Sequence, residues 1–157
     1  MKIYSLLLIG MFFSINVLAC EQDDTEIISC SLVGEASRNV SFCLNKKNQE
    51  INYYFKRAGK IELNVLFNIE RKLKRLTDEN MGVTYLGFSK GQFGYILSII
   101  NGAESEEYSM SFDIKKDNKI IQTTECSSNS YRSDNIVSKY IENIPYNSVK
   151  GNEFIFP

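Results

Sequence analysis

The feature that most limits what this chain can fold into is a strict period of two between residues 107 and 115. Tyr108, Met110, Phe112 and Ile114 are apolar or aromatic, and the residues between them are polar. Because successive side chains of a β-strand point to opposite faces, this alternation predicts a strand with one buried and one exposed face.

Runs of the same β-forming type recur along the chain at short intervals. Turns that contain Gly, Asn or Asp separate most of them, as in Arg57-Ala58-Gly59. The predicted strands cover residues 27–32, 39–44, 51–56, 60–67, 82–89, 93–100, 107–115 and 119–126. About eight short strands with tight turns are typical of an all-β fold, either an antiparallel β-sandwich or a closed barrel.

Two segments depart from this pattern. Residues 67–80 place Leu73 and Leu76 at helical spacing among cations, so this segment is either a short amphipathic helix or the charged end of a strand. Residues 133–144 predict a C-terminal helix, capped by Ser133 or Asp134 and stopped by Pro145. Its expected apolar stripe consists of Ile136, Val137, Tyr140, Ile141 and Ile144.

Residues 1–19 have the order of a secretory signal peptide. Lys2 supplies a positive charge before an apolar run, and the small residue Ala19 precedes the expected cleavage point. The run is shorter than the roughly 20 apolar residues of a membrane span. We therefore expect one β-rich domain, residues 20–157, in the periplasm or outside the cell.

Cys20 allows a second interpretation. Val17-Leu18-Ala19-Cys20 is similar to the lipobox of bacterial lipoproteins, in which a lipid on the cysteine anchors the protein to the envelope. We expect the protein to associate with a membrane only if Cys20 carries a lipid. The even count of four cysteines favours two disulfides instead, because lipidation would leave an odd number in an oxidising compartment.

Four cysteines leave three connectivities open. If the turn after the first predicted strand centres on Ala36-Ser37, Cys30 faces Cys43 and a cross-strand bridge between them is geometrically reasonable. Cys20 would then pair with Cys126.

The composition excludes several kinds of site. The chain has no histidine, so it cannot build a Ser-His-Asp triad, a Cys-His dyad or a zinc site that uses imidazole. It has no glycine-rich phosphate loop, and its net charge of −1 gives no electrostatic case for nucleic acid. We expect no catalytic residue, metal or cofactor, although hydrolysis by a pair of carboxylates passes this filter.

Two charged clusters are the candidate partner-binding residues. Glu104, Glu106 and Glu107 lie in one loop, and an acidic loop can enter the basic cleft of a partner protein. The basic cluster suits an acidic partner, and its members are Arg71, Lys72, Lys74 and Arg75. For each cluster the simpler alternative is a solvated surface.

The order of several short motifs carries a family resemblance. These are Cys20, Ser29-Cys30, Cys43, Tyr53-Tyr54-Phe55, Gly59-Lys60-Ile61-Glu62-Leu63, Phe93-Gly94-Tyr95 and Cys126. Together they resemble small, mostly uncharacterised, exported β-rich disulfide proteins of Gram-negative bacteria. Lys56 stands where that family usually has Gly, and the residues after Cys126 extend beyond the usual pattern. The resemblance implies export, a β fold and disulfides, and it brings no catalytic residues.

These observations lead us to expect an exported, non-enzymatic protein that binds another protein. A periplasmic inhibitor or immunity protein, directed against a cell-wall hydrolase or a toxin, is the concrete form of this hypothesis. Two alternatives stay open. One is a lipid-anchored envelope protein with a structural role, and the other is a hydrolase with two carboxylates roughly 5–10 Å apart.

Overall fold

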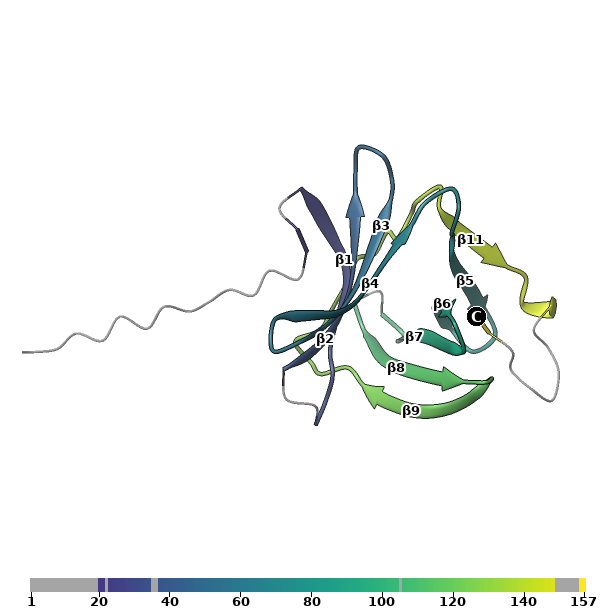
Figure 1. Ribbon diagram of the computed structural model, residues 1–157. Coiled ribbons are helices and arrows are strands. Elements are labelled where there is room, and N and C mark those ends of the chain that lie inside the picture. Colours follow the sequence, from purple (N-terminus) through teal and green to yellow (C-terminus); the bar gives the residue numbers. More distant parts are fainter. Residues whose placement is uncertain (1–19, 22, 35–36, 105, 149–155) are drawn as a thin grey trace, which may run out of the picture.

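The computed structural model describes residues 20–21, 23–34, 37–104, 106–148 and 156–157 (Figure 1). The expected signal peptide, residues 1–19, lies outside them. The described chain is built from strands and one 3-10 helix, η1, at Tyr146–Ser148. Among these residues there is no helix with the length and apolar character needed to cross a membrane.

The first sheet is antiparallel and has the strand order β10-β1-β2-β3-β4. Its strands are β1 (Asp24–Ser31), β2 (Arg38–Asn45), β3 (Ile51–Arg57), β4 (Lys60–Phe67) and β10 (Tyr131–Arg132). The predicted hairpin between β3 and β4 is confirmed. Its turn residues Ala58 and Gly59 have φ angles of 47° and 76°, and a two-residue type I′ turn requires both to be positive.

The second sheet has the order β11-β5-β6-β7-β8-β9. Its strands are β5 (Leu73–Asp78), β6 (Val83–Lys90), β7 (Phe93–Asn101), β8 (Tyr108–Lys116), β9 (Lys119–Glu125) and β11 (Ile141–Ile144). β11 pairs with β5 in parallel, and the other pairs are antiparallel. Each predicted strand is present, and the structure adds β5, β10 and β11.

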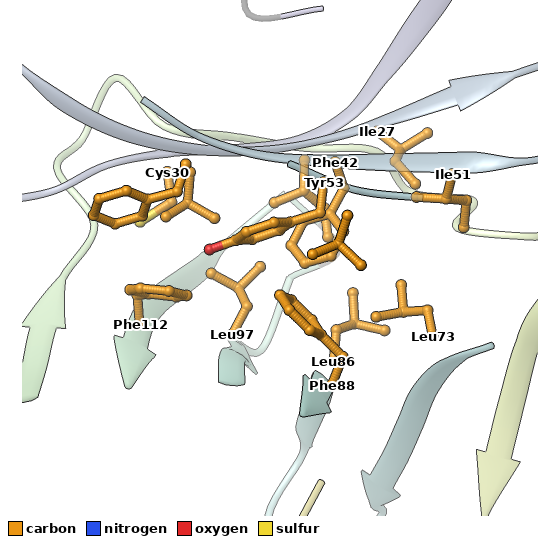
Figure 2. Close-up of a cluster of buried hydrophobic side chains, with 14 of the residues drawn as sticks. Ile27, Cys30, Phe42, Ile51, Tyr53, Leu73, Leu86, Phe88, Leu97 and Phe112 are labelled. Carbon is orange, nitrogen blue, oxygen red and sulfur yellow. The ribbon is translucent and has the colours of Figure 1, made fainter. Parts of the chain in front are cut away.

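The two sheets turn one face each toward a shared core (Figure 2). Phe42 and Tyr53 come from the first sheet and Leu97 and Phe112 from the second, and none is more than 1% exposed. Burying one such apolar side chain fully contributes about 1.5–3 kcal/mol. The described strands therefore form an all-β fold of two facing sheets, and they do not close into a barrel.

The expected disulfide pairing is wrong. The structure joins Cys20 to Cys43 and Cys30 to Cys126, rather than Cys30 to Cys43 and Cys20 to Cys126. The reason is the register of the first hairpin, in which Cys30 lies opposite Val40. Cys43 is three residues beyond Val40, and an odd offset places Cys30 and Cys43 on opposite faces of the sheet. Cys30 therefore faces the shared core, and Cys43, which is also fully buried, lies on the other face of the sheet.

The helix expected over residues 133–144 is also wrong. These residues belong to an extended segment, residues 131–145, which we call the strap. The strap leaves the first sheet at β10, passes the β2–β3 turn and joins the second sheet as β11 (Figure 1). Ile136 and Ile141 pack against the shared core, whereas Val137 is 60% exposed. The helical spacing in the sequence therefore does not reflect one buried face.

Neither interpretation of residues 67–80 is correct, because the segment contains no helix and its strand, β5, is separate from β4. β4 ends at Phe67, and the side chain of Asn68 organises the following turn. Its Oδ1 accepts the N–H groups of Glu70 at 2.9 Å and Arg71 at 3.3 Å. An Asn side chain that bonds the backbone two residues ahead replaces a backbone turn, and β5 then begins at Leu73.

The outer face of the second sheet carries a second, smaller core. Leu76, Ile96 and Phe156 form it, and Phe156 is 2% exposed. The Lys115 Nζ donates a hydrogen bond to the Phe156 carbonyl oxygen at 2.8 Å. Both faces of the second sheet are thus partly buried.

Candidate functional site

The described residues form a cleft of about 570 Å³ between the strap and strands β5, β6 and β7. Its floor is the inner face of the second sheet, where Leu86 and Ile99 lie. This volume falls within the range of roughly 300–1,000 Å³ found for ligand sites. The polar part of the wall consists of Arg75, Thr77, Glu79, Asn80, Thr84, Asn101, Arg132, Asp134 and Asn143, with Ser133 beside them.

Arg75 enters the cleft because it shares a strand face with Leu73, which lies in the shared core. Its Nε donates to Asn143 Oδ1 at 2.8 Å, and its Nη1 donates to the Ile136 carbonyl oxygen at 2.9 Å. Both acceptors belong to the strap. Arg75 therefore ties the strap to the second sheet and has a defined position at the cleft wall.

Arg132 reaches the cleft from β10. Its backbone N–H donates to the Tyr108 hydroxyl oxygen at 3.1 Å, and its guanidinium carbon lies 4.7 Å from the centre of the Tyr108 ring. Its Nη2 lies 3.5 Å from Asp134 Oδ1, and the side chain is 14% exposed, against 86% for Asp134. The cation is recessed, and the carboxylate stands at the rim.

The predicted acidic loop forms the hairpin end between β7 and β8. The Gly102 N–H donates to the Glu107 carbonyl oxygen at 2.6 Å, and the Glu107 N–H donates to the Glu104 carbonyl oxygen at 3.1 Å. Glu104, Glu106 and Glu107 are all exposed. Glu104 also lines a depression of about 300 Å³ that shares Arg132 with the cleft.

A further carboxylate comes from the turn between β5 and β6. Asp78 is 3% exposed, and its Oδ1 accepts the N–H groups of Asn80 at 3.0 Å and Met81 at 3.2 Å. A hydrogen bond from the Tyr146 hydroxyl to Asp78, together with the charge of that carboxylate, raises the pKa of Tyr146. Asp78 thereby fixes the turn, and Glu79 stands exposed at the cleft.

The strand directions bring these turns together. β5 and β7 end, and β6 and β8 begin, at the same end of the second sheet, where the Asn101 N–H donates to the Gly82 carbonyl oxygen at 3.0 Å. We call this region the acidic end. It consists of Glu79, Glu104, Glu106, Glu107 and Asp134.

The predicted basic cluster is not brought together. Arg71 and Lys72 are exposed in the β4–β5 turn, at the opposite end of the second sheet from the acidic end. Lys74 and Arg75 are consecutive in β5, so their side chains point to opposite faces. Of the four, Arg75 alone lines the cleft.

The two ends of the second sheet consequently differ in charge. The turns opposite the acidic end carry Arg71, Lys72, Lys90, Lys116 and Lys119, against Glu70 and Asp117. A separation of this kind orients an approaching charged protein before contact.

Three charged residues of the site were not predicted from the sequence. Glu79 lies in a loop that was recognisable only as polar, Arg132 precedes the expected helix, and Asp134 was expected only as a cap of that helix. The nearest local signal is Asp78-Glu79-Asn80, since Asp and Asn favour turns whose tips are exposed.

The cleft suits recognition by charge and hydrogen bonding. Among the described residues no group of three or more His, Cys, Asp or Glu could hold a metal ion. Glu79 and Asp134 are the carboxylates at the cleft, and both are exposed.

Comparison with known proteins adds no relative. No family model matches the chain, and no curated protein or solved structure does either.

Proposed function

We propose that this chain is an exported protein that binds a cationic protein at its acidic end and blocks it. An inhibitor of a cell-wall hydrolase or an immunity protein against a toxin acts in this way. The observation that carries the proposal is the acidic end itself. Its exposed carboxylates come from the β5–β6 turn, the β7–β8 hairpin and the strap. Glu79 and Asp134 line the cleft, and Glu104 lines the adjoining depression.

The rigidity of the acidic end supports binding. Backbone hydrogen bonds close the hairpin that carries Glu104, and the buried Asp78 holds the turn that carries Glu79. Side chains on preorganised turns lose less entropy when a partner docks.

The disulfides support export to the periplasm or the medium. Two disulfides persist in oxidising compartments and are rare in the cytosol. The Sγ of Cys20 is bonded to Cys43, so it is not available for the thioether of a lipid anchor. This favours a free protein over the lipid-anchored structural protein.

A pair of matched charge reversals tests the proposal. Glu104→Lys and Glu70→Lys each replace an exposed turn glutamate and change the net charge equally, but at opposite ends of the second sheet. The probes are purified basic lysozyme-type hydrolases and cationic protein toxins. Against a probe that the native chain inhibits, Glu104→Lys should weaken inhibition about 3- to 10-fold, as expected for an altered charge contact at an interface rim.

The control decides the interpretation. Glu70→Lys should leave inhibition unchanged, and added salt should weaken the native interaction because exposed charges are screened. Equal effects of both variants would mean that net charge alone acts. No inhibition of any probe, together with no binding in solution, would refute the proposal.

A further inference from the structure

Two glycines on the outer face of the second sheet lie directly beneath Phe156 and Pro157. A Cβ added at Gly87 of β6 would lie 2.8 Å from Phe156 Cε1, and one added at Gly94 of β7 would lie 3.3 Å from Pro157 Cδ. Neither glycine has a positive φ, so the backbone conformation does not require them. Glycine inside a strand often marks a place where another segment approaches closely, and here that segment is Phe156-Pro157.

The space above these glycines holds an aromatic ring. The Phe156 side chain packs with Leu76 of β5 and Ile96 of β7, and the partly buried Tyr85 packs against them. The centroids of the Phe156 and Tyr85 rings are 6.4 Å apart with a tilt of 57°, which is within the range of attractive aromatic pairs. We call the place formed by Leu76, Tyr85, Gly87, Gly94, Ile96 and Lys115 the outer site.

Two side chains of the second sheet bind the backbone of the docked residues. Lys115 is 5% exposed, and its Nζ donates to the Phe156 carbonyl oxygen at 2.8 Å. The Ser89 Oγ donates to the Pro157 carbonyl oxygen at 3.4 Å. Phe156 and Pro157 themselves belong to neither sheet. Because every residue has a carbonyl oxygen, these two hydrogen bonds fit any segment that follows the same path.

The outer site continues into a cavity beside Pro157. This cavity has a volume of about 200 Å³ and lies between the β6–β7 turn and the β8–β9 turn. Its polar lining includes Ser89, Gln92, Lys115 and Asn118. A bound segment can therefore extend past its proline into polar surroundings.

We infer that the outer site binds a segment of a partner protein in which an aromatic residue is followed by proline, and that Phe156-Pro157 occupies this site within the same chain. The docked residues define the chemistry of the ligand, since the site contacts one ring, one proline and two carbonyl oxygens. A partner segment of the same kind competes with them for the site. The acidic end contributes no residue to the outer site, so the inference does not rest on the proposed function.

Titration of the isotope-labelled chain with the peptide acetyl-Gly-Phe-Pro-Ser-amide, followed by NMR, tests the inference. Phe156→Ser removes the docked ring, so the peptide should bind this variant with a dissociation constant of roughly 0.1–1 mM and shift the amide signals of Gly87 and Gly94. The native chain should need about tenfold more peptide, because its own tethered segment competes at an effective concentration of the order of millimolar. As the peptide displaces that segment, the Phe156 amide signal of the native chain should move to its random-coil position.

Gly87→Ala is the matched control. It also displaces Phe156, but its methyl group takes the place of the ring, so the peptide should bind it at least about tenfold more weakly than it binds Phe156→Ser. The peptide acetyl-Gly-Ala-Pro-Ser-amide lacks the ring and should bind Phe156→Ser equally weakly. The NMR spectrum shows whether each variant is folded, and displacement in the native chain needs no variant. Equal binding of the two variants or of the two peptides, or a native Phe156 signal that does not move, would overturn the inference.

Discussion

Replacing Gly87 by alanine should expel Phe156 and Pro157 from the outer face of the second sheet. A Cβ at position 87 would lie 2.8 Å from Phe156 Cε1, 3.1 Å from Pro157 Cβ and 3.1 Å from the Tyr95 carbonyl oxygen. Carbon atoms do not approach to 2.8 Å without repulsion, so the Phe156 ring must move. In its present place the ring is 2% exposed beside Leu76.

The expected loss of stability follows from the burial of the Phe156 ring and from the hydrogen bond to the Phe156 carbonyl. Exposing a buried phenylalanine costs about 1.5–3 kcal/mol, and losing the hydrogen bond from Lys115 to the Phe156 carbonyl costs about 1 kcal/mol more. Alanine is better than glycine inside a strand by about 0.5–1 kcal/mol, which offsets part of this. The net decrease in the free energy of unfolding for Gly87→Ala should be about 1.5–3.5 kcal/mol.

A double-mutant cycle separates this mechanism from damage to the sheet. Denaturant unfolding is measured for the native chain, Gly87→Ala, a chain that lacks residues 156–157, and the combination. In the shortened chain Gly87→Ala should be neutral or slightly stabilising, because the clashing ring is gone. A similar loss in both backgrounds would refute the reasoning and assign the cost to the contact with Tyr95. Gly94→Ala is a milder control, since its Cβ would lie 3.3 Å from Pro157 Cδ.

Two further predictions concern the disulfides and the core. Replacing both cysteines of Cys30–Cys126 by alanine should lower the free energy of unfolding by about 4.5 kcal/mol, and replacing those of Cys20–Cys43 should lower it by about 3.5 kcal/mol. The loop-entropy model predicts this order because the sequence separations are 96 and 23 residues. Peptide mapping without reductant should recover these two pairs, and denaturant unfolding should rank them in this order. Burial raises the pKa of Tyr53 well above its ordinary value of 10.0, so the stability that this residue contributes is present below pH 10.0 and is lost as the pH rises through its folded pKa. The Tyr53 hydroxyl is buried and has no hydrogen-bond partner among the described atoms. Tyr53→Phe should therefore leave the free energy of unfolding unchanged or raise it by about 1 kcal/mol at neutral pH, and above pH 10 the variant should unfold less readily than the native chain. Denaturant titration at both pH values measures the difference.

The hairpins were predictable because each strand buries one face and each tight turn has its own local signal. The period of two in β8 places Met110 and Phe112 in the shared core, as expected. The residues of β5 show no period of two, although they also form a strand. Leu73 faces the shared core and Leu76 faces the second core under Phe156, and burial on both faces produces the spacing of three that also suits a helix.

The strap could not be predicted from its own residues. Ile136 and Ile141 contact the shared core, and Ile144 packs beside Leu76 on the outer face. A segment whose apolar residues pack in two different clusters along its path has no single buried face, so any apparent period is accidental. Tertiary contacts then override the cap at Ser133 and the helical spacing.

The disulfide error shows how much depends on one register. An even offset would have kept Cys30 and Cys43 on one face, where a bridge is possible, and the observed offset of three separates them. The face that Cys30 occupies also decides its partner, because Cys126 follows β9 at the edge where the two sheets meet through the Leu32–Cys126 bridge.

The acidic end could be predicted from the number and order of the strands rather than from any sequence motif. In an antiparallel run of neighbouring strands, alternate turns lie at the same end of the sheet. Once residues 73–78 are known to be a strand, the β5–β6 turn with Glu79 and the β7–β8 hairpin with Glu104 must share an end, and the β4–β5 turn with Arg71 must lie at the other. This charge separation could be predicted from the sequence only if residues 73–78 were recognised as a strand, and their pattern also suited a helix. The place of Asp134 at the acidic end could not be predicted, because it depends on the path of the strap in the folded chain.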